Sequence, residues 1–290
     1  MSTPDRLTKT QRRDEARAAA LKLREQQQRT AKRQRTIVIA AAVGGVVVLA
    51  VLIWTILAQG SHPSTLADVA LRPAGSTLSG GIPVGADGVA GSTATATPAA
   101  DAVVVAVYSD YLCPICGVFE QTNGATLDEL RQSGAIVVEY HPVSILDRSS
   151  GGTAYSTRSA TAAALVAAQA PEAFVAFHNA LFTNQPAETS DTPYLTDAQI
   201  AEIARTAGVP EAVAATIESG EYLGTQADAA GKPLDQTYVP WVLAATEQAS
   251  KDLGQLGTPT IVIDGKVLDT KQYNWQEPGV LAQAIADAKG

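Results

Sequence analysis

Apolar runs and helical repeats alternate through residues 101–290, and together they predict a domain of the α/β class. Residues 102–108 form a seven-residue run dominated by valine, which is typical of a strand buried on both faces of a sheet. A helix is predicted from the residues that follow to about residue 132, and a second strand over residues 135–140. A strand, a helix and a second strand in this order predict a parallel pair joined by a right-handed crossover.

The pattern changes to helices between about residues 144 and 256. Helices are predicted over residues 154–170 and 171–182, from the Thr196 to Gln199 capping box onward, from Pro210 onward, and over residues 241–253. The sequence then predicts a strand at residues 260–263, a hairpin turn at 264–265, a return strand at 266–268 and a helix from 278 to 288. The prediction is therefore an α/β core divided by a helical insertion that is larger than the core itself.

Residues 37–58 form a stretch of 22 residues without a charge, which predicts a transmembrane helix. At 1.5 Å per residue such a helix would span about 33 Å, enough for the hydrocarbon core of a bilayer. Lys32, Arg33 and Arg35 precede the stretch, so the positive-inside rule predicts a cytoplasmic N-terminus and an extracytoplasmic domain. A cleaved signal peptide is the alternative, but its apolar region is typically about 7–15 residues long, so we favour a retained signal anchor.

The chain has 290 residues and a net charge of −8, which is unevenly distributed. Residues 1–36 hold 11 lysines and arginines against 4 acidic residues, whereas the remainder carries a net charge of −15. Attraction to anionic lipid or to nucleic acid is one interpretation of this basic arm. Because no aromatic or apolar stripe accompanies the charge, we favour a solvated helix that fixes topology, and we expect no nucleic-acid partner. Residues 59–100 are rich in small residues and proline, which predicts a linker, with a short hairpin around residues 82–89.

The chain contains two cysteines, Cys113 and Cys116, between the first predicted strand and its helix. Two cysteines exclude a disulfide-stapled scaffold and a four-cysteine metal site. At a helix N-terminus, unpaired N–H groups and the positive end of the helix dipole would stabilise the Cys113 thiolate. Such surroundings lower a cysteine pKa from ~8.5 toward roughly 3.5–7.5, and the thiolate is the attacking species in disulfide exchange. Pro114 suits the first helical turn, and Ile115 offers no charge, so the backbone and the dipole are expected to supply the stabilisation.

Two other interpretations of the cysteine pair stay open at this point. It could be half of a metal site, with further ligands among His62, His141 and His178, or it could be a purely structural disulfide. His62 lies in the predicted linker and the other two histidines lie in different elements, so we expect no metal. The position between a strand and a helix favours redox chemistry.

A second element of the predicted site is the Thr258–Pro259 pair at the entrance to a strand. The bond before a proline is the one peptide bond that adopts the cis form at low cost. A cis bond here would turn the Thr258 backbone outward, where it could pair with an extended peptide. A trans proline that ends a loop is the alternative.

Residues 101–290 resemble the thioredoxin fold, and in particular the DsbA-type thiol:disulfide oxidoreductases. The resemblance rests on residues 108–112 leading into the Cys113 to Cys116 motif, on residues 174–182, and on residues 253–260 leading into 261–265. It implies that Cys113 is a solvent-exposed nucleophile, Cys116 the resolving thiol and Pro259 a cis-proline beside them. The best-known oxidases of the family carry histidine at the position of Ile115, so the resemblance implies a weaker oxidant here and leaves the direction of electron flow open. We expect Thr258, Pro114 and Ile115 to contact the substrate.

Four other polar residues near these motifs are weaker candidates for the site. His178 and His141 are expected to be packed histidines rather than catalytic ones, and Asp110 a turn former rather than a proton relay. Glu139, on the second strand, could be a buried acid near Cys116, although a satisfied surface carboxylate is the interpretation we favour.

The sequence therefore predicts a bacterial, membrane-anchored, extracytoplasmic thiol:disulfide oxidoreductase that oxidises or isomerises protein cysteines through Cys113 and Cys116. Its expected partners are cysteine-containing secreted or membrane proteins, the lipid bilayer at residues 37–58, and a membrane redox partner that reoxidises the dithiol. No cofactor is expected. Two alternatives remain: an anchored peptide-binding module with a structural disulfide, and an extracytoplasmic thioredoxin-like reductase.

Overall fold

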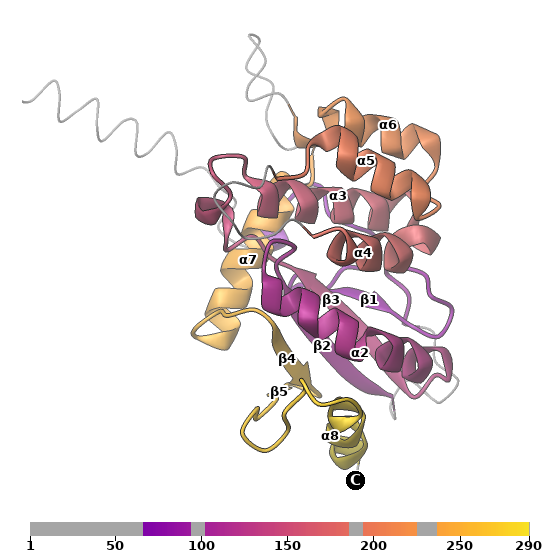
Figure 1. Cartoon of the computed structure of the whole chain (residues 1–290), viewed down its shortest axis with the longest axis vertical. Helices are drawn as coiled ribbons and strands as arrows, with labels where there is room; N and C mark the ends of the chain where they lie inside the picture. The colour runs from indigo at the N-terminus through magenta and orange to yellow at the C-terminus, as the bar shows by residue number, and fades with distance from the viewer. Residues whose placement is uncertain (1–65, 94–101, 186–193, 225–236, 290) are drawn as a thin grey trace, which may run out of the picture. The chain divides into compact units, whose positions relative to one another are not determined.

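A five-stranded sheet runs through the part of the chain that the computed structural model describes, which is residues 66–93, 102–185, 194–224 and 237–289 (Figure 1). Its strands are β1 (Ile82–Val84), β2 (Val103–Ser109), β3 (Ile136–Pro142), β4 (Thr260–Ile263) and β5 (Lys266–Val267). They lie in the order β1-β3-β2-β4-β5, so β2 is central. Strands β2 and β3 are parallel, as predicted, and the other neighbouring pairs are antiparallel.

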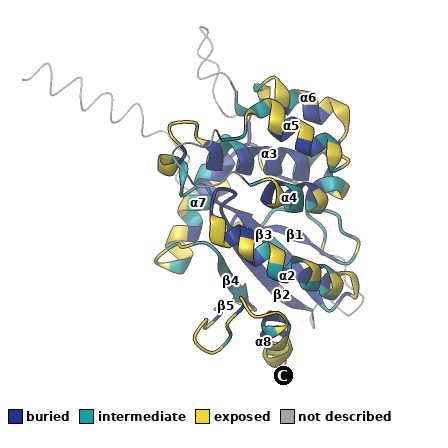
Figure 2. Cartoon of the chain, in the orientation of Figure 1, coloured by how far each residue is buried: buried dark blue, intermediate teal, exposed yellow. Residues whose placement is uncertain are grey.

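The two faces of the sheet are covered by different helices. On one face, Val105, Val107 and Val138 belong to the main core, to which α2 (Pro114–Gln132) and α8 (Val280–Lys289) contribute their apolar sides. Figure 2 shows α2 with buried residues on one side and exposed residues on the other. On the opposite face, Ala106 and Tyr108 pack with Ala249 of α7 (Val239–Leu253). This alternation along β2 is the period of two that a strand covered on both faces requires.

The predicted helical insertion lies between β3 and β4. It contains α3 (Tyr155–Gln169), α4 (Phe174–Thr183), α5 (Asp197–Thr206), α6 (Glu211–Glu218), α7 and the short 3-10 helices η2 (Asp147–Ser149), η3 (Pro171–Ala173) and η4 (Glu221–Leu223). The capping box predicted at Thr196 and Gln199 is present. Pro210 caps α6 and does not occupy its first helical position. Helix α4 packs against α2, so the insertion reaches the helix that begins at the cysteines.

The folded domain begins before residue 101, inside the segment that composition predicts as a linker. After η1 (Leu66–Asp68), strand β1 pairs with β3, placing Ile82 opposite Tyr140, and Val84 forms a further bridge with Ala90. A three-residue strand is too short to show a period of two, and Pro83 is tolerated because β1 is an edge strand. The segment therefore contains a short hairpin bridge, as predicted, and in addition adds an edge strand to the sheet.

A cluster of polar side chains fixes this N-terminal segment to β3. Oε1 of Glu139 accepts hydrogen bonds from the hydroxyls of Thr77 (2.7 Å) and Ser79 (3.3 Å) and lies 3.1 Å from Nε2 of His141. Burial acts to raise the pKa of Glu139, but the hydrogen bonds from His141, Thr77 and Ser79 lower it overall. A Cβ atom at Gly81 would clash with the Glu139 side chain, so any larger residue here would displace this carboxylate.

Neither interpretation of Glu139 from the sequence describes its position. Its side chain is only 14% exposed, so it is not a surface carboxylate. Its neighbours in β3, Val138 and Tyr140, belong to the core that contains Cys116, so the alternation of the strand turns Glu139 to the other face. The residue joins two segments of the domain.

None of the helices in the described part of the chain combines the length and the hydropathy that a bilayer-spanning segment needs. The predicted basic arm (residues 1–36) and membrane anchor (residues 37–58) lie outside the described residues.

Replacement of Glu139 by alanine should lower the free energy of unfolding by about 2–4 kcal/mol, because the buried His141 and the half-buried Thr77 would lose their acceptor. Chemical denaturation of the domain measures this loss. Glu129→Ala is a matched control, since Glu129 is exposed on α2, and its effect should stay within about 0.5 kcal/mol. A Glu139→Ala loss no larger than that of the control would contradict the assigned role.

Candidate active site

Cys113 lies at the start of α2, in the position that the sequence predicts. It is the N-cap residue of the helix, with extended backbone angles, and Pro114 follows at the first helical position. The N–H of Cys113 donates to the carbonyl of Asp110 at 2.9 Å, which closes the turn between β2 and α2. The backbone N–H groups of the first helical turn therefore face the Cys113 side chain.

The two cysteines differ in burial, but Cys113 is less open than predicted. Cys116 is fully buried and Cys113 is 7% exposed, and both are free thiols. The expectation of a solvent-exposed nucleophile is therefore wrong for this structure, because the Thr258 segment lies against Cys113 from another part of the chain. Exposed residues follow it in the helix: Pro114 is exposed, and Ile115 is 47% exposed.

The second predicted element meets the first at this point. The Thr258–Pro259 bond is cis, and the Sγ–H of Cys113 donates to the Thr258 carbonyl at 3.3 Å. The antiparallel pairing of β2 with β4, which places Tyr108 opposite Thr260, brings the two segments together although they are 145 residues apart. The site thus contains Cys113, Cys116 and the cis proline, as the resemblance implies.

The surroundings of Cys113 favour its thiolate. The side chain of Cys116 makes the largest contribution, because its hydrogen bond to the Cys113 sulfur lowers the pKa of Cys113. Burial opposes this effect, and hydrogen bonds from the Thr258 side chain and from the N–H groups of Cys116 and Ile115 add to it. The result is a pKa of about 6 for Cys113. Backbone groups therefore contribute as predicted, but the neighbouring thiol contributes more.

Cys116 has the opposite character. Burial raises the pKa of its thiol far above the ordinary value, and the hydrogen bond to Cys113 and the charge on Cys113 raise it further. At neutral pH the pair therefore carries one thiolate, at Cys113, and one proton, at Cys116. Two chemically identical side chains thus have different roles: Cys113 is the attacking thiolate, and Cys116 is a protonated thiol.

A comparison with models of known protein families matches residues 92–277 of this chain to the family described as thioredoxin. The match covers more than half of the chain. The chain belongs to the thioredoxin family.

Three solved structures of thioredoxin-family relatives illustrate the similarity. Reduced DsbA from Mycobacterium tuberculosis is 30% identical, and the match covers 72% of this chain and 99% of that protein with a TM-score of 0.50. Reduced DsbG from the same organism is also 30% identical, with 72% and 94% covered and a TM-score of 0.51. MdbA, a thiol-disulfide oxidoreductase from Actinomyces oris, is 24% identical with 72% and 88% covered and a TM-score of 0.56, and it supports the fold alone. By its structural neighbours, the chain is a thiol-disulfide oxidoreductase of the DsbA type.

A further relative is the serine/threonine-protein kinase PknE of Mycobacterium tuberculosis. It is 31% identical over 182 residues, which are 62% of this chain and 29% of the kinase. The chain thus matches less than a third of the length of that relative, and the similarity concerns one part of it.

Asp110 supports the thioredoxin-family active site as a turn former, in agreement with the interpretation from the sequence. It is fully buried, and its carboxylate accepts hydrogen bonds from the N–H groups of Leu112, Ile145 and Leu146 at 2.8–3.0 Å. Burial raises the pKa of Asp110, and these N–H donors oppose that rise. The residue therefore joins the active-site turn to the loop that follows β3.

The two described histidines are packed residues, as predicted, and each of them contacts a glutamate. His178 lies 3.2 Å from Glu120 of α2, and its Nδ1 is hydrogen-bonded to the Tyr111 hydroxyl at 2.8 Å. His141 contacts Glu139 and stacks on Tyr108 with ring centroids 4.0 Å apart. No hydrogen bond in the described residues joins either histidine to a cysteine, and His62 lies outside those residues.

Sequence reasoning missed one residue of the site, Gln185. Its side-chain amide donates to the carbonyls of Tyr111 and Cys113, at 2.9 and 2.7 Å. No local signal marks a glutamine that lies 72 residues beyond its partner. Its place three residues after the motif at residues 174–182 is the only hint that the sequence offers.

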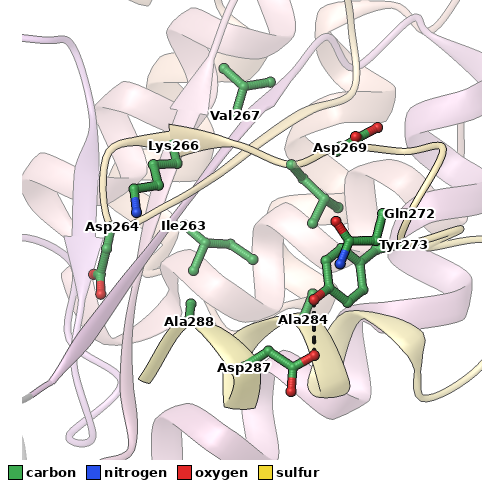
Figure 3. Close-up of a pocket in the computed structure, with 11 residues that line it drawn as sticks. Ile263, Asp264, Lys266, Val267, Asp269, Gln272, Tyr273, Ala284, Asp287 and Ala288 are labelled. Carbon is green, nitrogen blue, oxygen red and sulfur yellow. Dashed lines mark hydrogen bonds between the residues drawn. The ribbon is translucent and has the colours of Figure 1, made fainter. Parts of the chain in front are cut away.

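A cavity of about 570 Å³ lies at the other end of β4, between the β4–β5 turn and α8 (Figure 3). Asp264, Lys266, Asp269 and Tyr273 line it, and the Tyr273 hydroxyl donates to Asp287 across its floor. The cavity contains neither cysteine, so it is separate from the thioredoxin-family site.

The Cys113 thiol in the reduced protein should titrate with a midpoint near pH 6. Cys116→Ala should raise this midpoint toward ~8.5, because the variant removes the hydrogen bond that contributes most to thiolate stability. Cys116→Ser retains a hydroxyl donor and should give an intermediate value. Ultraviolet absorbance of the thiolate, or the rate of alkylation as a function of pH, measures all three proteins. An unchanged midpoint in Cys116→Ala would show that the backbone alone sets the pKa.

Proposed function

We propose that this chain oxidises pairs of cysteines in protein substrates by dithiol–disulfide exchange through Cys113 and Cys116. One observation carries the proposal. Cys113 is the N-cap of a helix beside a cis proline and has a pKa of about 6, while Cys116 is buried and stays protonated. A stabilised thiolate stabilises the reduced enzyme, so the disulfide form becomes the better oxidant.

The first step begins with the Cys113–Cys116 disulfide. A substrate thiolate attacks Sγ of Cys113, the bond between the two enzyme sulfurs breaks, and Cys116 leaves with the electron pair and takes up a proton. A mixed disulfide then joins the substrate to Cys113. Because the pKa of Cys116 is strongly raised by burial, Cys116 remains a thiol and rarely attacks this mixed disulfide in return.

The second step completes the oxidation. A second substrate cysteine, as its thiolate, attacks the substrate sulfur of the mixed disulfide and displaces Cys113. Cys113 is a good leaving group because the low pKa of its thiol stabilises the departing thiolate. Two substrate thiols are oxidised to one disulfide, and the enzyme disulfide is reduced to a thiolate and a thiol.

The surface beside Cys113 suits an extended peptide. The Thr258 backbone precedes the cis bond beside Cys113 and would pair with such a segment, and Pro114 and Ile115 offer exposed apolar surface at the start of α2. Val118, one turn further along the helix, is 40% exposed and extends this surface. Backbone pairing with few side-chain contacts would allow many different cysteine-containing proteins to bind.

We further propose that residues 37–58 anchor the enzyme in a membrane, with the catalytic domain on the extracytoplasmic side. The 22 uncharged residues and the basic flank before them support this orientation. Thiols outside the cytoplasm are not kept reduced by cytosolic systems, which favours the oxidising direction. The substrates would then be secreted or membrane proteins, and a membrane redox partner would reoxidise the dithiol.

Cys113→Ser should abolish both the oxidative refolding of a reduced, disulfide-containing protein and the reduction of insulin. The reduction potential of the wild-type domain then gives the direction: about −120 to −200 mV supports an oxidase or isomerase, and a value near −270 mV a reductase. A potential below about −300 mV, with both assays unaffected by Cys113→Ser, would instead indicate a binding module with a structural disulfide.

The full chain should remain with the membrane fraction after extraction at alkaline pH, whereas a chain that starts at residue 59 should be released. Protease added to intact cells stripped of their wall should remove the catalytic domain and spare the N-terminal arm. A full-length chain that is found in the soluble fraction would contradict the proposed anchor.

A further inference from the structure

Gln185 brings a side-chain amide from the helical insertion onto the active-site turn. It lies two residues beyond the end of α4 and is half-buried. Its Nε2 atom donates to two backbone carbonyls of the turn, those of Tyr111 at 2.9 Å and Cys113 at 2.7 Å. A primary amide has two N–H donors, so both bonds can form at once.

The Cys113 carbonyl accepts hydrogen bonds from several donors at once. It already receives the N–H of Cys116 at 3.1 Å and the N–H of Gly117 at 3.3 Å, in the first turn of α2. The Cys116 N–H also bonds to the Cys113 sulfur and helps to lower its pKa. The carbonyl oxygen and the sulfur of Cys113 therefore compete for one donor. A third donor on the carbonyl weakens its hold on the Cys116 N–H and leaves that N–H freer to face the sulfur.

Gly117 makes room for this amide. It is a buried residue within α2, where a glycine ordinarily costs helix stability relative to alanine. A Cβ atom at Gly117 would clash with Oε1 of Gln185, and Gln185 is the only residue outside the helix's own neighbouring backbone that such an atom would meet among the described residues. An alanine here would therefore displace the Gln185 amide and leave the helix backbone in place.

We propose that Gln185 is a positioning residue for the nucleophile: its amide satisfies the Cys113 carbonyl so that the Cys116 N–H is directed to the sulfur, and Gly117 supplies the space. This inference rests on the proposed role of Cys113. It makes the helical insertion part of the apparatus that sets the reactivity of the thiolate. A residue that merely tied the insertion to the turn would affect stability and leave the thiolate unchanged.

The test is the thiolate midpoint of Cys113 in the reduced domain, read by absorbance. Gln185→Ala should raise the midpoint by about half a unit to one unit, the equivalent of one ordinary hydrogen bond. The equilibrium constant against glutathione should shift toward a weaker oxidant by about three- to ten-fold. Gln185→Glu should raise the midpoint further, because a carboxylate would face two carbonyl oxygens and add a negative charge to the active-site turn.

Gly117→Ala disrupts the same contact by displacing the Gln185 amide. It should raise the midpoint in the same direction, and the double variant Gln185→Ala with Gly117→Ala should exceed neither single variant by much, since both remove one interaction. Two controls should leave the midpoint unchanged. Asn184→Ala removes the neighbouring amide, which bonds to Ala180 of its own helix, and Gly124→Ala adds a methyl group to α2 two turns further on.

The outcomes are distinct. If Gln185→Ala and Gly117→Ala lower the melting temperature but leave the midpoint of Cys113 where it is, Gln185 is a structural tether and the inference is overturned. If Gln185→Ala does not fold, the Cys113 midpoint of Gly117→Ala alone decides between the two roles. Should Cys113→Ser retain full exchange activity, the proposed function fails, while the effect of Gln185 on the thiolate can still be measured.

Discussion

The pairing of β2 with β4 is the constraint on which the active site depends. Tyr108 lies opposite Thr260. Cys113 follows Tyr108 by five residues and Thr258 precedes Thr260 by two, so this pairing brings Cys113 to Thr258. Strand β2 is largely buried and β4 buries Ile261 and Ile263, so a slip of one residue would turn these side chains to the other face. The register that the core enforces therefore fixes the position of the sulfur relative to the cis proline, without any contact that is specific to the site.

Within that frame, burial of Cys116 and the hydrogen bonds that Cys113 receives separate the two cysteines. They are one helical turn apart and chemically identical, but Cys116 faces the core beside Phe119 and Cys113 faces the Thr258 segment. Desolvation keeps the proton on Cys116, and the protonated thiol then donates to Cys113 and stabilises the charge there. The high pKa of one thiol is thus a cause of the low pKa of the other. The resolving cysteine acts on the nucleophile before any substrate arrives.

The sequence predicts those features whose signals are local. The valine run gives β2, the Thr-x-x-Gln pattern gives the cap of α5, and the motif between strand and helix gives the N-cap position of Cys113. The sequence predicts a short hairpin around residues 82–89, and Val84 does bridge to Ala90, but the pairing of β1 with β3 is not predicted, because that partner lies beyond residue 135. The exposure of Cys113 is predicted wrongly for the same reason, since the covering segment is 145 residues away. Glu139 and Gln185 likewise have their roles only in the folded chain.

The helical insertion divides the two halves of the site in the sequence and also supports one of them in space. From α4, His178 holds the Tyr111 hydroxyl, and Gln185, seven residues further on, holds the Tyr111 carbonyl. Asp110 anchors the same turn to the loop after β3. A turn so short has few contacts of its own, so its geometry depends on neighbours that lie outside the cysteine motif. In such an arrangement, the reactivity of one thiol motif can change through residues that never touch sulfur.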